Sequence, residues 1–76
     1  MLGKRLREIR MAHALTQQQT ADHLMISLNA YQKYEQGTRA PSPETLVKLA
    51  DFFDTSTDWI LGRTEDPSFS RDVGER

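Results

Sequence analysis

The sequence predicts an all-α domain, and three observations support this fold class. Apolar side chains recur at spacings of three and four residues, the period of a helix with one buried face. Residues that favour helix N-caps precede most of these stretches, and glycine follows two of them. The alternation of apolar and polar residues that is typical of a strand does not occur. Because the connections are short, we expect five short helices packed into one compact bundle.

The first three helices are expected between residues 2 and 37. A single apolar stripe indicates the first helix, and it consists of Leu2, Leu6, Ile9 and His13. Thr16 is a good N-cap for the second helix, and Gln19 three residues later completes a T-x-x-Q capping box. This helix is short and ends near Met25. Ser27 caps the third helix, which Gly37 ends in the C′ position.

The last two helices follow the proline-containing segment "APSP". Ser42 is an N-cap, and the proline after it fits the first helical turn, where its missing N–H costs nothing. The clearest amphipathic stripe comes next and consists of Leu46, Leu49, Ala50 and Phe53. Ser56 caps a final short helix that Gly62 ends. We therefore expect a domain over residues 1–62 and a polar tail over residues 63–76.

The buried faces of these helices supply one small core. Its expected members are Leu6, Ile9, Leu15, Ala21, Leu24, Tyr31, Leu46, Leu49, Ala50, Phe53 and Ile60. Each large apolar member contributes roughly 1.5–3 kcal/mol when it is fully buried. Set against the entropy lost by the chain, this core predicts modest stability.

Composition restricts the class of protein. The chain has no cysteine, so neither disulfides nor thiolate metal ligands are available. Its longest apolar runs are only a few residues, too short to span a membrane, and no apolar stretch near Met1 suggests a signal peptide. We therefore expect a soluble, cytoplasmic protein with no membrane partner.

Charge is distributed unevenly along the chain, although the net charge is −1. Residues 1–40 carry six basic and three acidic side chains, a local charge of +3, whereas residues 41–76 carry four and eight, or −4. A surface that meets phosphate needs local positive potential rather than a high overall isoelectric point. Candidate cations for such a surface are Lys4, Arg5, Arg7, Lys33 and Arg39. A chance asymmetry explains the charges alone equally well.

Residues that commonly carry catalysis are explained here without it. His13 and His23 are ten positions apart on different helices, without metal-ligand spacing, so each is interpreted as a helix-surface or boundary residue. Three serines occupy helix N-caps: Ser27, Ser42 and Ser56. The four glycines are scattered and form no phosphate-binding loop. No catalytic residue, metal site or cofactor is therefore expected.

The second and third helices, joined by the tight bend "MIS", form a helix-turn-helix arrangement. In such a unit the second helix enters the major groove of DNA and the first crosses the backbone. One face of the third helix carries Leu28, Asn29, Gln32 and Lys33. Asn and Gln can pair with an adenine edge, and Lys donates to guanine or phosphate. The alternative is that this is only the solvated face of a bundle.

The stretch "LTQQQTADHLMISLNAYQKYEQGTRAPSPETLVKLADFFDTSTDWILG" resembles the lambda-repressor-like helix-turn-helix family, also called the XRE or Cro/repressor family. The resemblance runs from about Leu6 to Gly62. Its specific parts are "LTQ" at the second helix, "YEQGTRAPS" after the third, and the end "LVKLADFF…S.DWILG". It implies a five-helix domain that binds double-stranded DNA, usually as a homodimer on a pseudo-palindromic operator, and usually as a transcriptional regulator such as a repressor.

The resemblance also implies roles for individual residues. Base-reading and groove-facing places fall on Leu28, Asn29, Gln32 and Lys33. Contacts with the DNA backbone are implied for Gln17, Gln18, Ser27, Tyr34 and Arg39. Arg10 and Glu35 match a pair that forms an internal salt bridge in phage members of the family. Dimer contacts are expected from the C-terminal half, at Trp59 and Phe69.

Three residues depart from the family pattern. Met25 and Ala14 stand where the family often has glycine, so each has to accept a left-handed or adjusted backbone conformation. Leu28 is apolar at a usually polar recognition position, which suits either a thymine methyl or a protein partner. A protein-interaction module or an antitoxin-type regulator is therefore the alternative function. A buried Tyr31 would favour DNA, whereas outward-facing tyrosines would favour protein.

Overall fold

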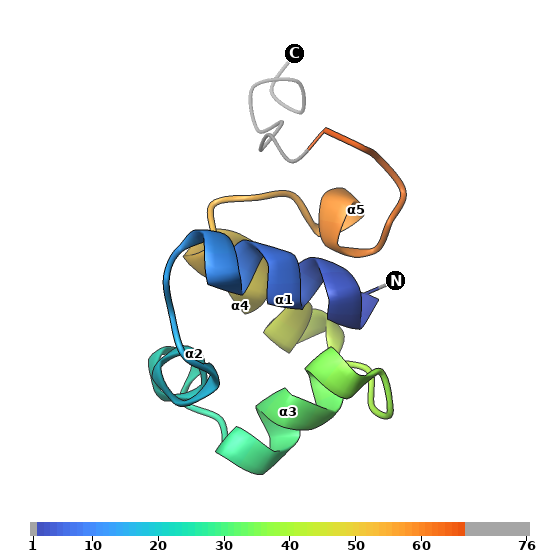
Figure 1. The fold of residues 1–76 in the computed structure, drawn as a ribbon. Helices are drawn as coiled ribbons and strands as arrows, with labels where there is room; N and C mark the ends of the chain where they lie inside the picture. Colours follow the sequence, from blue (N-terminus) through green and yellow to red (C-terminus); the bar gives the residue numbers. More distant parts are fainter. Residues whose placement is uncertain (1, 67–76) are drawn as a thin grey trace.

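The computed structural model describes residues 2–66, which form five helices and no strand (Figure 1). The helices are α1 (Leu2–Ala12), α2 (Gln17–Leu24), α3 (Leu28–Gln36), α4 (Pro43–Phe52) and α5 (Thr57–Ile60). The predicted all-α class and the predicted order of elements are therefore confirmed. Phe69 and most of the expected tail lie outside the described residues.

Four helices begin at the predicted N-caps. The Thr16 side chain accepts a hydrogen bond from the backbone N–H of Gln19, whose own side chain accepts from the N–H of Thr16, which completes the predicted capping box. Ser27, Ser42 and Ser56 each accept from the N–H three residues further on. These local hydrogen bonds satisfy N–H groups that the first turn of a helix leaves without partners.

All five helices end in the same backbone motif. A residue with positive φ follows each helix, and its N–H and the next N–H bond back to carbonyls of the last turn, as in a Schellman motif. These residues are Ala14, Met25, Gly37, Asp54 and Gly62, with φ values between 54° and 81°. Only two are glycines. The left-handed conformation required of Met25 and Ala14 is confirmed, whereas that of Asp54 was not anticipated.

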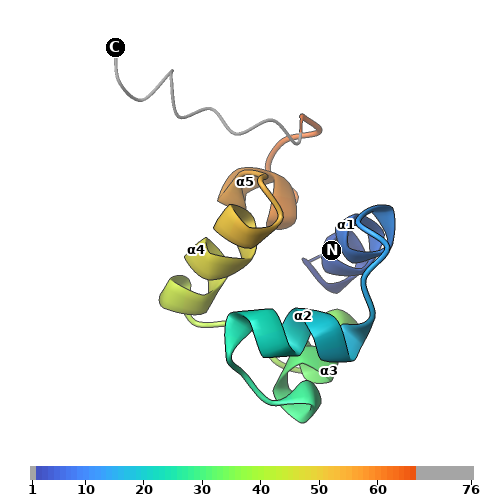
Figure 2. The same ribbon diagram turned by 90° about the vertical axis from the view of Figure 1, so that its left-hand side faces the viewer.

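The helices pack so that α2 and α3 lie together toward one end of the bundle and α5 toward the other (Figures 1 and 2). In the packing, α3 contacts both α1 and α2, while α5 contacts α1 and α4. Figure 2 shows α2 in front of α3, with α1 and α4 on either side. The predicted helix-turn-helix pair therefore stands at the edge of the bundle and keeps one face of α3 free.

Every predicted core residue is buried or packed against the core. The buried members are Leu6, Ala21, Leu24, Tyr31, Leu49, Ala50, Phe53 and Ile60, and Ile9, Leu15 and Leu46 pack against them. Tyr34 also belongs to the core, with only 5% of its surface exposed. The exposed position expected for Tyr34 is therefore wrong, because this residue follows Tyr31 by three and shares its inward face.

Gly3 has a structural role that the sequence analysis missed. A Cβ atom at this position would lie 2.3 Å from the carbonyl oxygen of Glu35 and 2.8 Å from that of Tyr34. Real side chains do not approach backbone oxygens so closely. The absence of a side chain at Gly3 therefore allows α1 to pack directly against the C-terminal half of α3.

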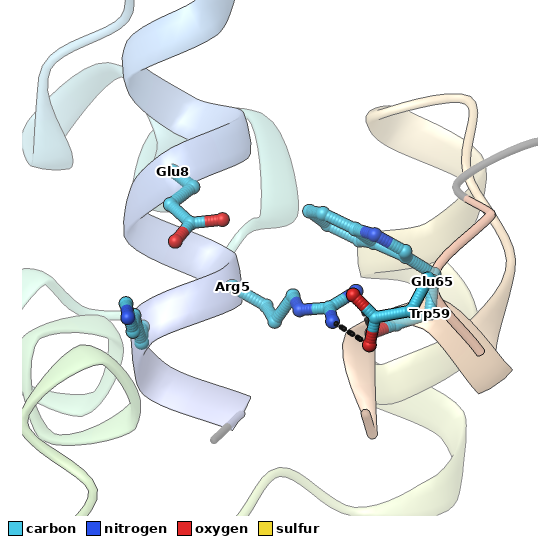
Figure 3. A pocket seen from close by; sticks show the side chains of 5 residues that line it. Arg5, Glu8, Trp59 and Glu65 are labelled. Atoms are coloured by element: carbon cyan, nitrogen blue, oxygen red, sulfur yellow. Dashed lines mark hydrogen bonds and ion pairs between the residues drawn. The ribbon is translucent and has the colours of Figure 1, made fainter. Parts of the chain in front are cut away.

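Arg5 fastens α1 to α5 and to the segment after it (Figure 3). Its Nη1 donates to the carbonyl oxygens of Trp59 and Thr64, both at 3.2 Å, and its Nη2 donates to Oε2 of Glu65 at 3.0 Å. The guanidinium carbon lies 4.6 Å from the centre of the Trp59 ring, a cation–π distance. Arg5 is buried, so its expected availability for DNA phosphate is wrong.

Candidate nucleic-acid interface

The turn between α2 and α3 is short and well bonded. Met25 has φ 59° and ψ 39°, and its N–H bonds to the carbonyls of Ala21 and Asp22. The N–H of Ile26 also bonds to the carbonyl of Ala21, at 3.1 Å, and Ser27 then starts α3. This sequence of bonds fixes the direction in which α3 leaves α2, and it gives the geometry of a helix-turn-helix.

The predicted base-reading residues form one accessible stripe along α3. Asn29 and Lys33 are exposed, and Leu28 and Gln32 are partly exposed. Within residues 2–66, the side chains of Asn29 and Lys33 have no hydrogen-bond or ion-pair partner, so their polar groups are available to a ligand. Tyr31 is buried on the opposite face of α3. A buried Tyr31 was expected if this helix contacts DNA, whereas outward-facing tyrosines were expected for contact with a protein.

A chain of side-chain amides connects this stripe to α2. Nε2 of Gln32 donates to Oε1 of Gln17 at 3.2 Å, and Nε2 of Gln17 donates to Oε1 of Glu35 at 3.1 Å. Because Glu35 accepts only, it determines which end of the Gln17 amide faces it, and Gln17 then presents its oxygen to Gln32. The residue expected to hold a phosphate therefore also orients a residue expected to read a base.

The Arg10–Glu35 pair that the resemblance implies is present. Nε of Arg10 lies 2.6 Å from Oε2 of Glu35, and Nη2 lies 3.2 Å from Oε1, so the pair is bidentate. Nη1 of Arg10 donates to the carbonyl of Leu15 at 2.8 Å, and the Tyr31 hydroxyl donates to Oε2 of Glu35. The pair joins α1 to α3 and leaves no free N–H on the side of Arg10 that faces Glu35.

The surroundings of this pair keep it ionised at neutral pH. Burial alone would raise the pKa of Glu35, but hydrogen bonds from Arg10, Tyr31 and Gln17 outweigh it and hold the pKa below its usual value. The hydrogen bond to Glu35 raises the pKa of Arg10. Burial, and then the hydrogen bond to Glu35, raises the pKa of the Tyr31 hydroxyl. The network therefore carries one charge of each sign and one neutral phenol.

The remaining residues predicted to contact the DNA backbone differ in availability. Gln18 and Arg39 are exposed; Nε2 of Gln18 donates to Oδ1 of Asp22 at 2.8 Å, whereas Arg39 has no ion pair within residues 2–66. Ser27 is exposed, and its oxygen accepts the capping hydrogen bond of α3, while within residues 2–66 its hydroxyl donates to no other group. Tyr34 is buried and has little surface to offer DNA.

The two histidines lie at helix surfaces, as expected. The His13 ring meets Phe53 edge-on at 5.4 Å between ring centres, and the His23 ring stacks on Phe52 at 5.0 Å. Within residues 2–66, no three side chains with metal-binding groups lie together. None of the five helices described is long and apolar enough to cross a membrane.

The comparison with known proteins agrees with this geometry. A helix-turn-helix family model matches residues 6–60, which covers all five helices except the first turn of α1. The chain belongs to this helix-turn-helix family. The matched segment contains the whole α2–turn–α3 unit together with the Arg10–Glu35 pair.

Curated relatives of this helix-turn-helix chain are named as transcriptional regulators. The chain is 43% identical over 67 residues to an uncharacterized HTH-type transcriptional regulator, YobD, of Bacillus subtilis, covering 88% of this chain and 60% of that protein. It is 42% identical over 64 residues to the regulator ImmR of the same organism, covering 84% and 50%. It is 47% identical over 62 residues to the cryptic phage CTXphi transcriptional repressor RstR of Vibrio cholerae, covering 82% and 55%. The chain thus spans about half the length of these relatives.

Proposed function

We propose that this chain binds double-stranded DNA in a sequence-specific manner and acts as a transcriptional regulator, specifically a repressor. The observation that carries the proposal is the accessible stripe on α3, where Asn29 and Lys33 have free side chains while both tyrosines of the helix are buried. A solvated face needs no such concentration of amides. The names of the relatives, regulators and a phage repressor among them, support the same function.

In this proposal α3 lies in the major groove and reads one half-site. Asn29 and Gln32 pair with adenine edges, Lys33 donates to guanine or to a phosphate, and Leu28 meets a thymine methyl group. The residues that position the domain on the backbone are Gln17, Gln18, Ser27 and Arg39. Tyr34 is omitted because it is buried.

We also propose that the chain binds as a homodimer. One recognition helix covers only about four or five base pairs, so two half-sites about one helical turn apart are needed for a useful site. Trp59 on α5 is partly exposed and Leu61 beside it is 44% exposed, which supports a contact from this part of the molecule. The basic N-terminal half then stays free for DNA. Light scattering that gives a monomer both alone and on a palindromic site would refute the dimer.

Selection of bound sequences from random duplex DNA tests the function directly. We expect enrichment of a two-fold symmetric site whose halves contain the bases that Asn29 and Gln32 contact. Binding to that site should weaken steeply with salt: if three to five phosphates are met per subunit, the slope of log affinity against log salt is about −5 to −9 for a dimer. The DNA hypothesis would be refuted if no sequence were enriched from the random pool and if the affinity for duplex DNA did not change with salt concentration.

The alternative function, docking of a protein partner, rests on an apolar tip at the turn. Met25 is 89% exposed, and Leu28 at the start of α3 is partly exposed. If Asn29→Ala and Gln32→Ala leave DNA binding unchanged while Leu28→Ala abolishes binding to a protein, α3 is a docking face. If the amide substitutions weaken DNA binding, α3 reads DNA as proposed.

A further inference from the structure

The outer face of α1 carries two opposite charges without partners among the described residues. Lys4 and Glu8 are exposed and lie one turn apart, so they are neighbours on the helix surface. Neither forms an ion pair within residues 2–66. Both line a hollow beside Trp59. Figure 3 shows the Glu8 carboxylate apart from the Arg5–Glu65 pair. The charges of this face are therefore free to meet another molecule.

The helix α1 packs on its neighbours with its other faces. Gly3 faces α3, and Arg5 faces α5. Lys4, Glu8 and Met11 recur at spacings of four and three residues, so they form a separate outer stripe between those two contacts. Met11 leaves 59% of a large apolar side chain exposed on this stripe. In Figure 2 none of the other four described helices covers the outer side of α1.

The charge pattern of the outer stripe is complementary to itself. In a two-fold symmetric contact, residue i of one copy meets residue j of the other, and j meets i. Two α1 helices that lie antiparallel across such an axis can bring Lys4 of each copy to Glu8 of the other, which gives two ion pairs. Parallel helices would instead place like charges opposite each other, which is unfavourable. The stripe therefore fits a second copy of this chain in the antiparallel orientation.

The same two-fold axis suits a palindromic DNA site. In Figure 1, α1 crosses the molecule between α5 at one end and α2 with α3 at the other. A two-fold axis that runs from the α5 end to the α3 end, in front of α1, makes the two α1 helices antiparallel and leaves both α3 helices at the same end. Both copies can then face one duplex.

We infer that the outer stripe of α1 contacts a second copy of this chain through reciprocal Lys4–Glu8 ion pairs, with Met11 and Trp59 beside them. The inference rests on the proposed homodimer and names the charges that join its subunits. Lys4 then serves the contact between subunits, and the other exposed cations of the N-terminal half remain for DNA.

The contact is small, so it should form when DNA holds two copies together. One face of an 11-residue helix is small beside the roughly 800 Å² that each partner buries in a stable interface. Two copies on neighbouring half-sites are at a high effective concentration, where a weak contact is sufficient. The contact should therefore be measured as cooperativity between half-sites.

Charge reversal on the full chain tests the inference with the selected palindromic site. We expect the wild-type chain to bind the second half-site about tenfold more tightly than the first. Lys4→Glu leaves only negative charges across the contact and Glu8→Lys only positive ones, so each variant alone should lose that factor. An equimolar mixture of the two variants places opposite charges across the axis again and should restore the cooperativity.

Lys48→Glu is the matched control. Lys48 is exposed and has no ion pair within residues 2–66, and its helix α4 lies across the bundle from the outer side of α1 (Figure 2). This substitution makes the same charge change as Lys4→Glu and should keep the cooperativity. The two variants should bind a single half-site with equal affinity, since neither lysine is expected to touch DNA. A weaker half-site affinity for Lys4→Glu alone would show that Lys4 contacts DNA and would overturn the inference.

The remaining outcomes separate the inference from the proposals on which it rests. If the wild-type chain binds no duplex, the proposed function fails, and if it binds both half-sites independently, the proposed homodimer fails; the Lys4–Glu8 contact fails with either. If the wild-type chain and both single variants bind cooperatively, the homodimer stands and this contact is overturned. If the single variants lose cooperativity and their mixture does not regain it, the reciprocal pairing is wrong.

Discussion

The carboxamide of Gln32 on α3 donates to the carboxamide of Gln17 at the start of α2, with 3.2 Å between nitrogen and oxygen. Gln17 in turn donates to Glu35, which the Arg10 guanidinium holds. The side chain of Gln32, a proposed base-reading residue, is thus oriented by a chain of hydrogen bonds that runs through Gln17 and Glu35 to Arg10 on α1. Such a fixed amide loses less conformational freedom when it meets a base, because its orientation is set in advance.

The first prediction separates base readout from positioning. Asn29→Ala and Gln32→Ala should each cost about 1–3 kcal/mol on the preferred site and relax the preference at one base pair. The amino-acid sequence alone predicts that Gln17→Ala weakens binding to all DNA sequences by the same factor. The structure adds that it also frees Gln32, so it should relax the preference at the base pair read by Gln32 and leave that read by Asn29 intact.

A double-mutant cycle measures this coupling. The losses from Gln17→Ala and Gln32→Ala should sum to more than the loss of the double variant, by about 0.5 kcal/mol or more. The cycle between Gln17→Ala and Asn29→Ala is the control and should be additive. Affinities for the selected site and its single-base variants supply both results, and additivity in both cycles would mean that the amide contact has no role in recognition.

The second prediction concerns acid stability. Because the pKa of Glu35 is lowered in the folded state from its ordinary value of 4.5, its stabilising effect is present above that value. It is lost as the pH falls through the lower folded-state pKa. Urea unfolding at a series of pH values should therefore show the free energy of unfolding falling below about pH 4.5.

Glu35→Gln should remove part of this acid dependence. At neutral pH it should lower the free energy of unfolding by about 3 kcal/mol, since it leaves the largely buried Arg10 without its counter-charge. Glu8→Gln is the control, because Glu8 is an exposed residue of α1 with no ion pair within residues 2–66. Equal pH profiles for the two variants would contradict a central role for the Arg10–Glu35 pair.

The third prediction is the effect of Gly3→Ala. Helix propensity alone favours alanine inside a helix by roughly 0.5–1 kcal/mol. The contact with the Glu35 and Tyr34 carbonyls predicts the opposite sign, a loss of about 1–3 kcal/mol, because α1 has to move away from α3. Thermal unfolding decides between these signs. Gly37→Ala, where no atom lies within 4 Å but φ is +81°, should be destabilising through backbone strain alone.

The fourth prediction is that Met25→Gly stabilises the fold. Met25 has a left-handed backbone conformation and is 89% exposed, so glycine relieves strain and removes almost no packing. We expect the free energy of unfolding to rise by about 0.5–1 kcal/mol. This net value allows for the greater conformational entropy that glycine gives to the unfolded chain, which opposes the relief of strain. Ala14→Gly should act in the same direction. Ala12→Gly, within α1, should instead destabilise by a similar amount, as chemical denaturation of the three variants would show.

The sequence predicted those features that depend on neighbours along the chain. N-caps, helix ends and the apolar stripes involve residues a few positions apart, so the hydrogen bond of Ser27 and the end of α3 at Gly37 could be predicted. The left-handed conformation of Asp54, which follows the end of α4 at Phe52, was missed because aspartate also favours turns and N-caps, and no glycine marks the position.

Features that depend on packing between helices were missed. Periodicity shows that a helix has a buried face, but it does not show how wide that face is. Tyr34 and Arg5 were therefore assigned to the surface, although both are buried. The close contact at Gly3 and the amide contact of Gln17 with Gln32 join residues of different helices, and no local pattern encodes them. A glycine within an otherwise good helix was the one available signal for close packing at Gly3.

The contacts of Arg5 also bear on how the protein is made. Its partners Trp59, Thr64 and Glu65 come 54 to 60 residues later in the chain. During synthesis the N-terminal residues emerge first, at about 5–20 residues per second, so α1 leaves the ribosome seconds before the carbonyl groups that bind its arginine. The first helix therefore reaches its final packing only when the end of the domain is translated, and a chain halted after α4 would display an unneutralised arginine and an uncovered apolar face.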